Sequence, residues 1–128
     1  MKRVTGIGGI FFKAKDPKKL AAWYQKHLGV DLLSDTVATF KWKTGASRSR
    51  PGSTVWSVMP KTSKYFRPSK APFMINYRVD DLHALLKQLR RERVTVDPAI
   101  EESDFGKFGW VMDPEGNRIE LWEPPVGG

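Results

Sequence analysis

The segment DPEGNRIELWEP, Asp113 to Pro124, predicts a tight turn followed by a short strand that carries one carboxylate, Glu120. Pro114 suits the first corner of a type I turn, and Gly116 can adopt the positive φ of the bulge that ends such a turn. The residues around Glu120 in this strand are mostly apolar. The carboxylate is therefore either a solvent-facing residue on a half-buried strand or a metal ligand. Other parts of the sequence distinguish these two interpretations.

Pairing two strands around this turn places Trp110 opposite Glu120. Because side chains alternate along a strand, Ile119 and Leu121 then face one side, where a helix can pack. The other side carries Glu120 and three aromatic residues, Phe108, Trp110 and Trp122. We therefore expect Glu120 to point into a concavity and not to solvent.

Two halves of the chain share this organisation. GGIFFKAKDPKKLAAW (Gly8–Trp23) aligns with FMINYRVDDLHALLKQ (Phe73–Gln88) at an offset of 65 residues, and GSTVWSVMP (Gly52–Pro60) aligns with GNRIELWEP (Gly116–Pro124) at an offset of 64. Each half has the order strand, helix, strands, so the chain predicts a βαβββ module made twice. We expect one α+β domain over residues 1–128, with module 1 at about 5–60, a linker at about 61–71 and module 2 at about 72–124.

Start and stop signals define the helices. Asp16 and Asp81 are expected N-caps, Pro17 suits the first helical position, and Gly29 is expected to end the first helix in the left-handed conformation. Apolar spacing predicts the buried residues of each helix. These are Leu20, Trp23, Tyr24, His27 and Leu28 in the first helix and Leu82, Leu85, Leu86 and Leu89 in the second. The expected strands are Ile7–Lys15, Val37–Lys43, Thr54–Met59, Met74–Val79, Gly109–Met112 and Arg118–Trp122.

The two opening strands each present an apolar face and a mixed face. Ile10, Phe12 and Ala14, with Ile75, Tyr77 and Val79 in the second half, should pack on the helices. The opposite face carries Gly9, Phe11 and Lys13, matched by Met74, Asn76 and Arg78. A mixed face on a covered strand indicates a lined pocket, so we expect Glu120 and Asn76 to point into one concavity.

The segments GIGGIFFKAKDPKKLAAWYQKHLGV and FGKFGWVMDPEGNRIELWEP resemble the two signature ends of the vicinal oxygen chelate superfamily. That group includes glyoxalase I, bleomycin-resistance proteins and extradiol dioxygenases. The resemblance covers nearly the whole chain and implies paired βαβββ modules that form open, curved mixed sheets around a cavity. It is specific for the fold and not for the reaction.

The resemblance also implies four metal-ligand positions, one on the first and one on the last strand of each module. The first-strand position, seven residues before the helix-capping aspartate, is Gly9 in module 1 and Met74 in module 2. The last-strand position is Glu120 in module 2 and Trp56, or Ser57 with a slip of one residue, in module 1. Glycine offers no side-chain donor, a thioether is a poor ligand for hard divalent ions, and a catalytic zinc needs about three protein ligands. We therefore predict no metal at the usual site and no cofactor, with a divalent metal as the alternative.

Composition limits the function classes. The chain has 128 residues, no cysteine, 40% hydrophobic residues and a net charge of +8. No apolar run reaches the length of a membrane span, no signal peptide is evident, and the absence of cysteine makes a reducing cytoplasm the expected compartment. The charge permits binding of nucleic acid or of acidic ligands, but no nucleic-acid-binding motif accompanies it.

Glu120 has three possible roles: a structural carboxylate paired with Arg118, Arg78 or Asn76, a group that binds a donor on a ligand, or a metal-free general base. Its neighbours favour binding. The predicted ligand-binding residues are Phe11, Lys13, Trp56, Met74, Asn76, Arg78, Phe108, Trp110 and Trp122. We expect a homodimeric small-molecule-binding protein of the glyoxalase/bleomycin-resistance type whose organic ligand is aromatic or anionic. The alternatives are a divalent-metal-dependent glyoxalase-like lyase, isomerase or dioxygenase and, last, a nucleic-acid accessory domain.

Overall fold

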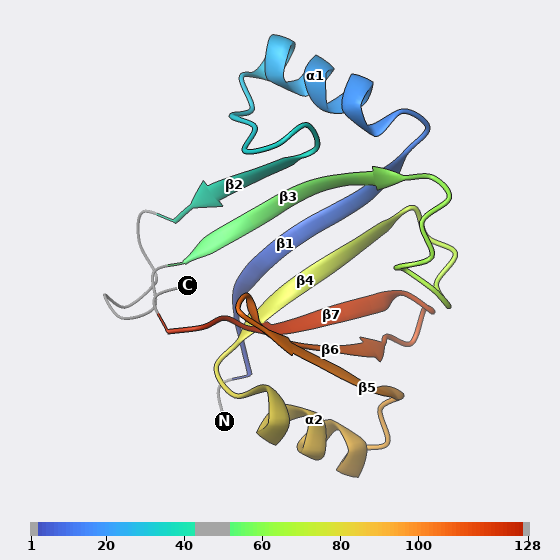
Figure 1. Cartoon of the computed structure of the whole chain (residues 1–128). Helices are drawn as coiled ribbons and strands as arrows, with labels where there is room; N and C mark the ends of the chain where they lie inside the picture. The colour runs from blue at the N-terminus through green and yellow to red at the C-terminus, as the bar shows by residue number, and fades with distance from the viewer. Residues whose placement is uncertain (1–2, 43–51, 127–128) are drawn as a thin grey trace.

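The computed structural model describes residues 3–42 and 52–126 and shows one open, curved sheet with two helices on one of its faces (Figure 1). The strands run in the spatial order β2-β3-β1-β4-β7-β6-β5. The elements are β1 (Val4–Ala14), α1 (Pro17–Leu28), β2 (Val37–Lys41), β3 (Ser53–Pro60), β4 (Phe73–Val79), α2 (Leu82–Arg91), β5 (Val96–Ser103), β6 (Gly106–Met112) and β7 (Arg118–Glu123). The α+β class is confirmed.

The two halves meet at the antiparallel pair β1–β4, where Ile10 lies opposite Ile75. On either side of this pair, β1 pairs with β3 and β4 pairs with β7, and both pairings are parallel. The predicted double βαβββ arrangement is therefore present. Among the described residues, module 2 has three strands after its helix, and module 1 has two strands and an isolated bridge between Leu32 and Ala38.

Capping and turn residues act as their types predict. The side chains of Asp16 and Asp81 accept hydrogen bonds from the backbone N–H groups of Lys19 and Ala84, each at 3.1 Å. Gly29 ends α1 with a φ of 68°. In the turn before β7, one carboxylate oxygen of Asp113 accepts the N–H groups of Glu115 and Asn117 at 2.9 Å, and Gly116 has a φ of 81°.

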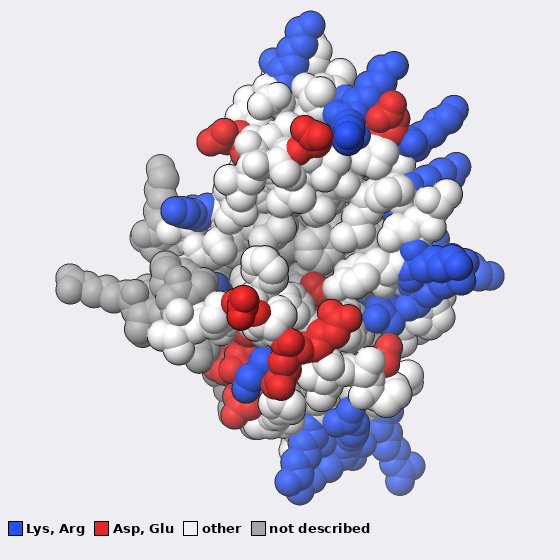
Figure 2. Space-filling view, in the orientation of Figure 1, with Lys and Arg blue, Asp and Glu red and all other residues white. Residues whose placement is uncertain are grey.

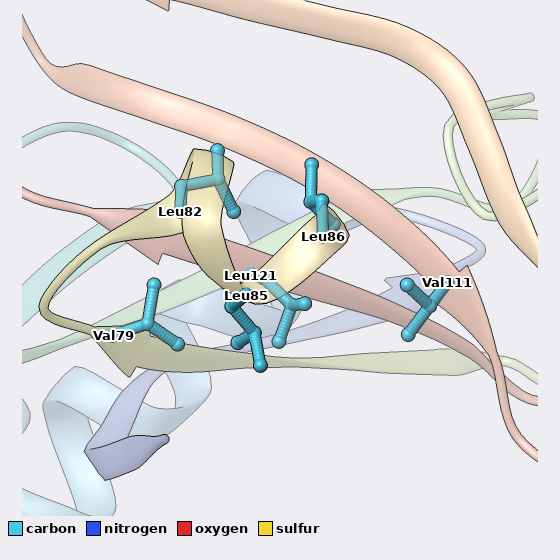
Figure 3. Close-up of a cluster of buried hydrophobic side chains, with 6 residues drawn as sticks. All are labelled: Val79, Leu82, Leu85, Leu86, Val111 and Leu121. Atoms are coloured by element: carbon cyan, nitrogen blue, oxygen red, sulfur yellow. The ribbon is translucent and has the colours of Figure 1, made fainter. Parts of the chain in front are cut away.

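Helix α2 packs on the sheet through the predicted leucines. Leu82, Leu85 and Leu86 are buried against Val79, Val111 and Leu121 (Figure 3). Leu89 is partly buried and packs against this cluster. Ile119 packs against the same cluster, so the predicted helix-facing side of β7 is confirmed. Burial of this apolar surface stabilises the second half of the fold.

Helix α1 packs differently from the prediction. Only Ala21 is fully buried, with Leu20 and Tyr24 partly buried, whereas Trp23 is 50% and Leu28 is 65% exposed and His27 is also exposed. The prediction that Trp23, His27 and Leu28 are buried is wrong. The helix approaches the sheet through the small side chain of Ala21, which turns the Trp23 and His27 side, whose rings lie 5.1 Å apart, toward solvent.

The expected strands are present, with ends that differ by a few residues. The predicted end of the second strand at Lys43 lies outside the described residues, and the described part ends at Lys41. Strand β5 was not expected. It is an edge strand that contains Pro98 and pairs with β6 through a register shift between Val96 and Ile100. None of the described helices is long and apolar enough to span a lipid bilayer.

Candidate ligand-binding site

Glu120 lies at the centre of a buried hydrogen-bond network on the face of the sheet opposite the helices. Its side chain is 1% exposed. Asn76 Nδ2 donates to Oε1 at 2.6 Å, Trp110 Nε1 donates to Oε2 at 2.9 Å, and the Tyr65 hydroxyl also donates to Oε2. The solvent-facing interpretation of Glu120 is therefore wrong, and the expected orientation into the sheet's concave side is confirmed.

The network balances a large desolvation cost. Burial raises the pKa of Glu120 above its ordinary value, and the hydrogen bonds from Tyr65, Asn76 and Trp110, together with the charge of Arg118, oppose that rise. Burial also raises the pKa of the Tyr65 hydroxyl, and the negative charges of Glu120 and Glu101 raise it further. Tyr65 therefore stays protonated and remains a donor to the carboxylate.

The orientation of the Asn76 amide follows from this network. An ionised carboxylate only accepts hydrogen bonds, so the amide nitrogen faces Glu120 and the amide oxygen faces away. Asn76 is 2% exposed, and its Oδ1 has no hydrogen-bond partner among the described residues. The oxygen lies beside Gly8, where a Cβ would collide with it and would come 2.8 Å from the Trp122 ring. Leaving a buried acceptor without a partner lowers the stability of the fold by about 1–3 kcal/mol, so a hydrogen-bond donor on a bound molecule would stabilise this oxygen.

The linker between the modules supplies part of the site. Tyr65 and Phe66 lie on the concave face, and Phe66 is fully buried against Met74 and Trp110. The Tyr65 ring meets the Trp110 ring edge-on at 6.2 Å. Sequence reasoning missed both residues because they lie in a Pro-, Ser- and Lys-rich segment. Two adjacent aromatic residues within such a segment were the available signal.

A cavity of about 280 Å³ adjoins the network and is called the site cavity below. Strands β1, β3, β4, β6 and β7, the linker and the β5–β6 turn all contribute to its wall. Its lining residues are Gly8, Phe11, Val55, Met59, Tyr65, Asn76, Phe105, Phe108, Glu120 and Trp122. The wall is almost entirely apolar, so the polar atoms of Asn76 and Glu120 are what can orient a bound molecule.

The nine predicted ligand-binding residues fall into three groups. Phe11, Asn76, Phe108 and Trp122 line the site cavity together with Glu120. Four others do not line it: Lys13, Met74, Arg78 and Trp110. Met74 and Trp110 are buried beneath Phe66, and the Lys13 ammonium lies 5.2 Å from the centre of the Phe66 ring. The Arg78 guanidinium lies 5.6 Å from the centre of the Trp42 ring and 5.9 Å from that of the Trp122 ring. Trp56 lies elsewhere.

Trp56 faces the helices, so the expectation that it shares the concavity is wrong. It packs against Phe12 and Tyr24, with ring centres 5.4 and 5.3 Å away. In the sheet, Trp56 pairs with Ile10, and Ile119 pairs with Ile75 at the equivalent position on the other side of the β1–β4 pair. The last strands of the two halves therefore correspond at an offset of 63 residues and not 64, and a slip of one residue moves a side chain to the opposite face of a sheet.

The residues around Glu120 do not fit the metal site that the resemblance implies. In the corrected register Ser57 corresponds to Glu120, and Phe11 corresponds to Asn76. The groups that point at the carboxylate are N–H and O–H donors, which complement an anion and repel a cation. Among residues 3–42 and 52–126, no group of three or more His, Cys, Asp and Glu side chains is arranged to hold a metal ion.

A larger hollow, of about 590 Å³, lies on the helix side of the molecule near the start of α1. Its polar lining residues, Lys15, Asp16 and Lys19, are all exposed. Exposed charged side chains on an open surface do not fix the orientation of a small ligand. The smaller site cavity, with its buried polar floor, is therefore the better candidate site.

An open sheet of two βαβββ halves that encloses a pocket opposite its helices defines the glyoxalase-like class of proteins. The chain belongs to the Glyoxalase/Bleomycin resistance protein/Dioxygenase superfamily, whose family model matches residues 6–121. The family resemblance stated from the two signature segments is thereby confirmed. No curated protein matches the sequence significantly.

Solved structures with the same fold include two methylmalonyl-CoA epimerases. The enzyme from Streptomyces coelicolor, in complex with 2-nitronate-propionyl-CoA, is 17% identical with a TM-score of 0.70, and covers 96% of this chain and 99% of its own. The enzyme from Mycobacterium tuberculosis is 20% identical with a TM-score of 0.63, covering 98% and 91%. A superfamily member from Vibrio splendidus is 11% identical with a TM-score of 0.61, covering 91% and 97%. At these identities the likeness shows the fold alone.

Proposed function

We propose that this protein binds a small organic molecule with a flat apolar group in the site cavity and does so without the usual metal. The observation that carries the proposal is a cavity of about 280 Å³ with aromatic walls and one buried carboxylate as its floor. Apolar walls with a few convergent polar groups are typical of small-molecule sites. Glu120 serves here as a binding group. A role as general base has less support, because both of its oxygens already accept hydrogen bonds from the protein.

The position of the cations favours an aromatic ligand over an anionic one. The hypothesis of an anionic ligand rests on Lys13 and Arg78, and neither lines the site cavity. Lys13 lies over the ring of Phe66, and Arg78 is 4% exposed beside Trp42 and Trp122.

We also propose that the protein is cytoplasmic, which is supported by a sequence without cysteine.

Ligand binding is tested by intrinsic fluorescence with a set of neutral, cationic and anionic one-ring compounds. A bound ring should change the emission of Trp122, which lines the site cavity, so replacing Trp122 by phenylalanine should remove most of the response. The matched control is Trp56→Phe, which should keep the response because Trp56 lies on the helix side. A wild-type protein that responds to no compound of any charge would overturn the proposal.

Metal content tests the alternative of a divalent-metal-dependent lyase, isomerase or dioxygenase. Protein purified without chelator is expected to carry far less than one equivalent of zinc, nickel, iron or manganese, because the groups around Glu120 are donors. Elemental analysis measures this directly. One equivalent of a transition metal that is lost in a Glu120→Gln variant would establish the alternative.

We also propose that the protein is a homodimer that uses the helix side of its sheet. The helices stand at opposite ends of the sheet and leave β1 and β4 uncovered between them (Figure 1). The uncovered strands carry a central stripe of large apolar residues that are 40–48% exposed: Val4, Ile7, Ile10 and Phe73. Their strand partners pack with the helices, which places the stripe on the helix side. Exposed apolar patches of this kind mark interaction surfaces.

The homodimer proposal predicts that Ile10→Glu yields a monomer in sedimentation experiments, because a charge would be buried at the centre of the central stripe. Phe105→Glu is the matched control, since Phe105 is 76% exposed on a different part of the surface and should leave the dimer intact. A wild-type protein that sediments as a monomer at high micromolar concentration would contradict the proposal.

A further inference from the structure

The hydrogen-bonding capacity left in the site cavity is of one kind. The donors in and below its wall already make hydrogen bonds within the protein: Asn76 Nδ2, Tyr65 Oη and Trp110 Nε1 donate to Glu120, and Trp122 Nε1 donates to the Phe105 carbonyl at 2.7 Å. The capacity that remains is for acceptance. Asn76 Oδ1 has no partner among the described residues, and Glu120 Oε1 accepts a single hydrogen bond where a carboxylate oxygen can accept two.

The walls of the site cavity attract positive charge. Five of its ten lining residues are aromatic: Phe11, Tyr65, Phe105, Phe108 and Trp122. The rings of Phe108 and Trp122 are nearly parallel, with an angle of 9° and centres 6.2 Å apart. The face of an aromatic ring is negative, so several rings around one space favour a cation that has left water.

The carboxylates near the site cavity add to this attraction. Glu120 lies in its floor, and Glu101 of β5 lies directly opposite Phe108 in the β5–β6 pairing, so it shares the cavity side of the sheet. On the face drawn in Figure 2, red side chains gather over the β5 region, while Lys and Arg project mainly at the periphery. Glu101, Glu102 and Asp104 are the exposed acidic residues there.

Three nearby cations lie outside the wall of the site cavity. Arg118 forms an ion pair with Asp97 at 3.2 Å and donates to the Arg67 carbonyl, and Lys13 and Arg78 lie against aromatic rings without lining the site cavity. The site cavity has aromatic walls and lies beside a buried acceptor without a partner, Asn76 Oδ1, and beside two carboxylates.

We propose that the ligand is a small organic cation, a protonated primary or secondary amine attached to a single aromatic ring. Its N–H groups donate to Asn76 Oδ1 and Glu120 Oε1, and its ring lies among Phe11, Phe108 and Trp122. This inference rests on the proposed function and names the ligand class for that same cavity. A cavity of about 280 Å³ admits one ring with a short chain and excludes larger amphiphiles.

The test compares three probes with one phenyl ring and a chain of similar length: 2-phenylethylamine, 2-phenylethanol and 3-phenylpropionate. Titration calorimetry at neutral pH is expected to show the amine binding at least about tenfold more tightly than the alcohol, with the propionate weakest. Equal or tighter binding of the alcohol or the propionate would overturn the inference and leave the proposed function standing. If none of the three binds while another compound of the fluorescence set does, the inference fails alone; if nothing binds, both fail.

Glu101 and Glu102 provide matched variants that do not disturb the buried network. Both are exposed, but Glu101 lies on the cavity side, whereas Glu102 pairs with Lys107 and contacts His83 of α2 at 3.1 Å. Glu101→Gln is expected to weaken binding of 2-phenylethylamine by about two- to fivefold, and Glu102→Gln should not change it. A Glu101→Gln variant that binds the amine as tightly as the Glu102→Gln variant would contradict a contribution of the Glu101 charge to binding in the site cavity.

Discussion

Replacing Glu120 by leucine is expected to lower the free energy of unfolding by about 2–4 kcal/mol, even though the position is fully buried. Leucine is apolar and of similar size, so burial alone would favour it. The cost comes from the donors that lose their acceptor, since Asn76 Nδ2 and Trp110 Nε1 are held in place by the sheet. The Tyr65 hydroxyl can turn toward the cavity, so it adds less. Urea denaturation at pH 7 measures the difference.

Glutamine at position 120 is the matched control and should stay within about 1 kcal/mol of the wild type at pH 7. Its oxygen can accept from Tyr65 and Trp110, and its nitrogen can donate to Asn76 Oδ1 once the Asn76 amide turns over. A Glu120→Leu variant as stable as Glu120→Gln would show that the carboxylate and its donors contribute little to folding.

The difference in stability between the wild type and Glu120→Gln should depend on pH, and the direction of that change can be predicted. The pKa of Glu120 is raised above 4.5 by burial, so in this range the folded state binds more protons than the unfolded state. Stability from this group is fully present below 4.5 and is lost as the pH rises through the folded-state pKa. Glu120→Gln has no such group. The stability of the wild type relative to Glu120→Gln should therefore fall from acid to neutral pH, and a rise would contradict the assignment.

The parts of the fold that sequence patterns predicted are those set by local chemistry. The turn around Pro114 and Gly116 determines the hairpin register, and the observed pairing of Trp110 with Glu120 follows from it. The leucines of α2 lie on one narrow stripe, so the apolar pattern identifies a single face of the helix as the buried one. From these two elements alone, the concave orientation of Glu120 could be predicted.

The errors arose where the pattern allows two solutions. In α1, apolar residues cover both the face of Leu20, Ala21 and Tyr24 and the adjacent side of Trp23 and His27, and periodicity cannot tell which of these packs on the sheet. In the structure, α1 packs on the sheet through the face that contains the small, fully buried Ala21.

Strand β5 was missed because its composition is that of a turn. Asp97 and Pro98 at its start and three polar residues at its end, Glu101, Glu102 and Ser103, disfavour a buried strand. Proline and polar residues are tolerated in an edge strand, because one side of its backbone needs no hydrogen-bond partner and its polar side chains reach water. The location of Glu101 opposite Phe108, on which the ligand class partly depends, follows from this pairing and was not accessible from periodicity.

The linker residues were missed because their packing partners are distant in sequence. Tyr65 contacts Glu120 and Trp110, which lie 55 and 45 residues further along the chain. No local pattern reports a contact of that range. The consequence for function is large, since the linker supplies both a donor to the carboxylate and part of the cavity wall.

Replacing Phe66 by alanine is expected to lower the free energy of unfolding by about 3–5 kcal/mol, the cost of removing a fully buried aromatic ring. Phe66 packs on Met74 and Trp110, so its loss leaves a void beneath the linker and frees Tyr65 from its position over Glu120. The amine affinity of the site cavity should fall in the same variant, because the carboxylate floor becomes accessible to water. Urea denaturation and titration with 2-phenylethylamine measure the two effects.

The matched control for the unfolding measurement is Phe105→Ala, which removes the same ring from a position that is 76% exposed at the β5–β6 turn. Its stability should stay within about 0.5 kcal/mol of the wild type, because little apolar surface is buried there. If Phe66→Ala were as stable as Phe105→Ala, the linker would not be part of the folded core. Its segment around Tyr65 and Phe66 would then be a loosely attached cover, and the donor that Tyr65 provides to Glu120 could not hold the carboxylate in place.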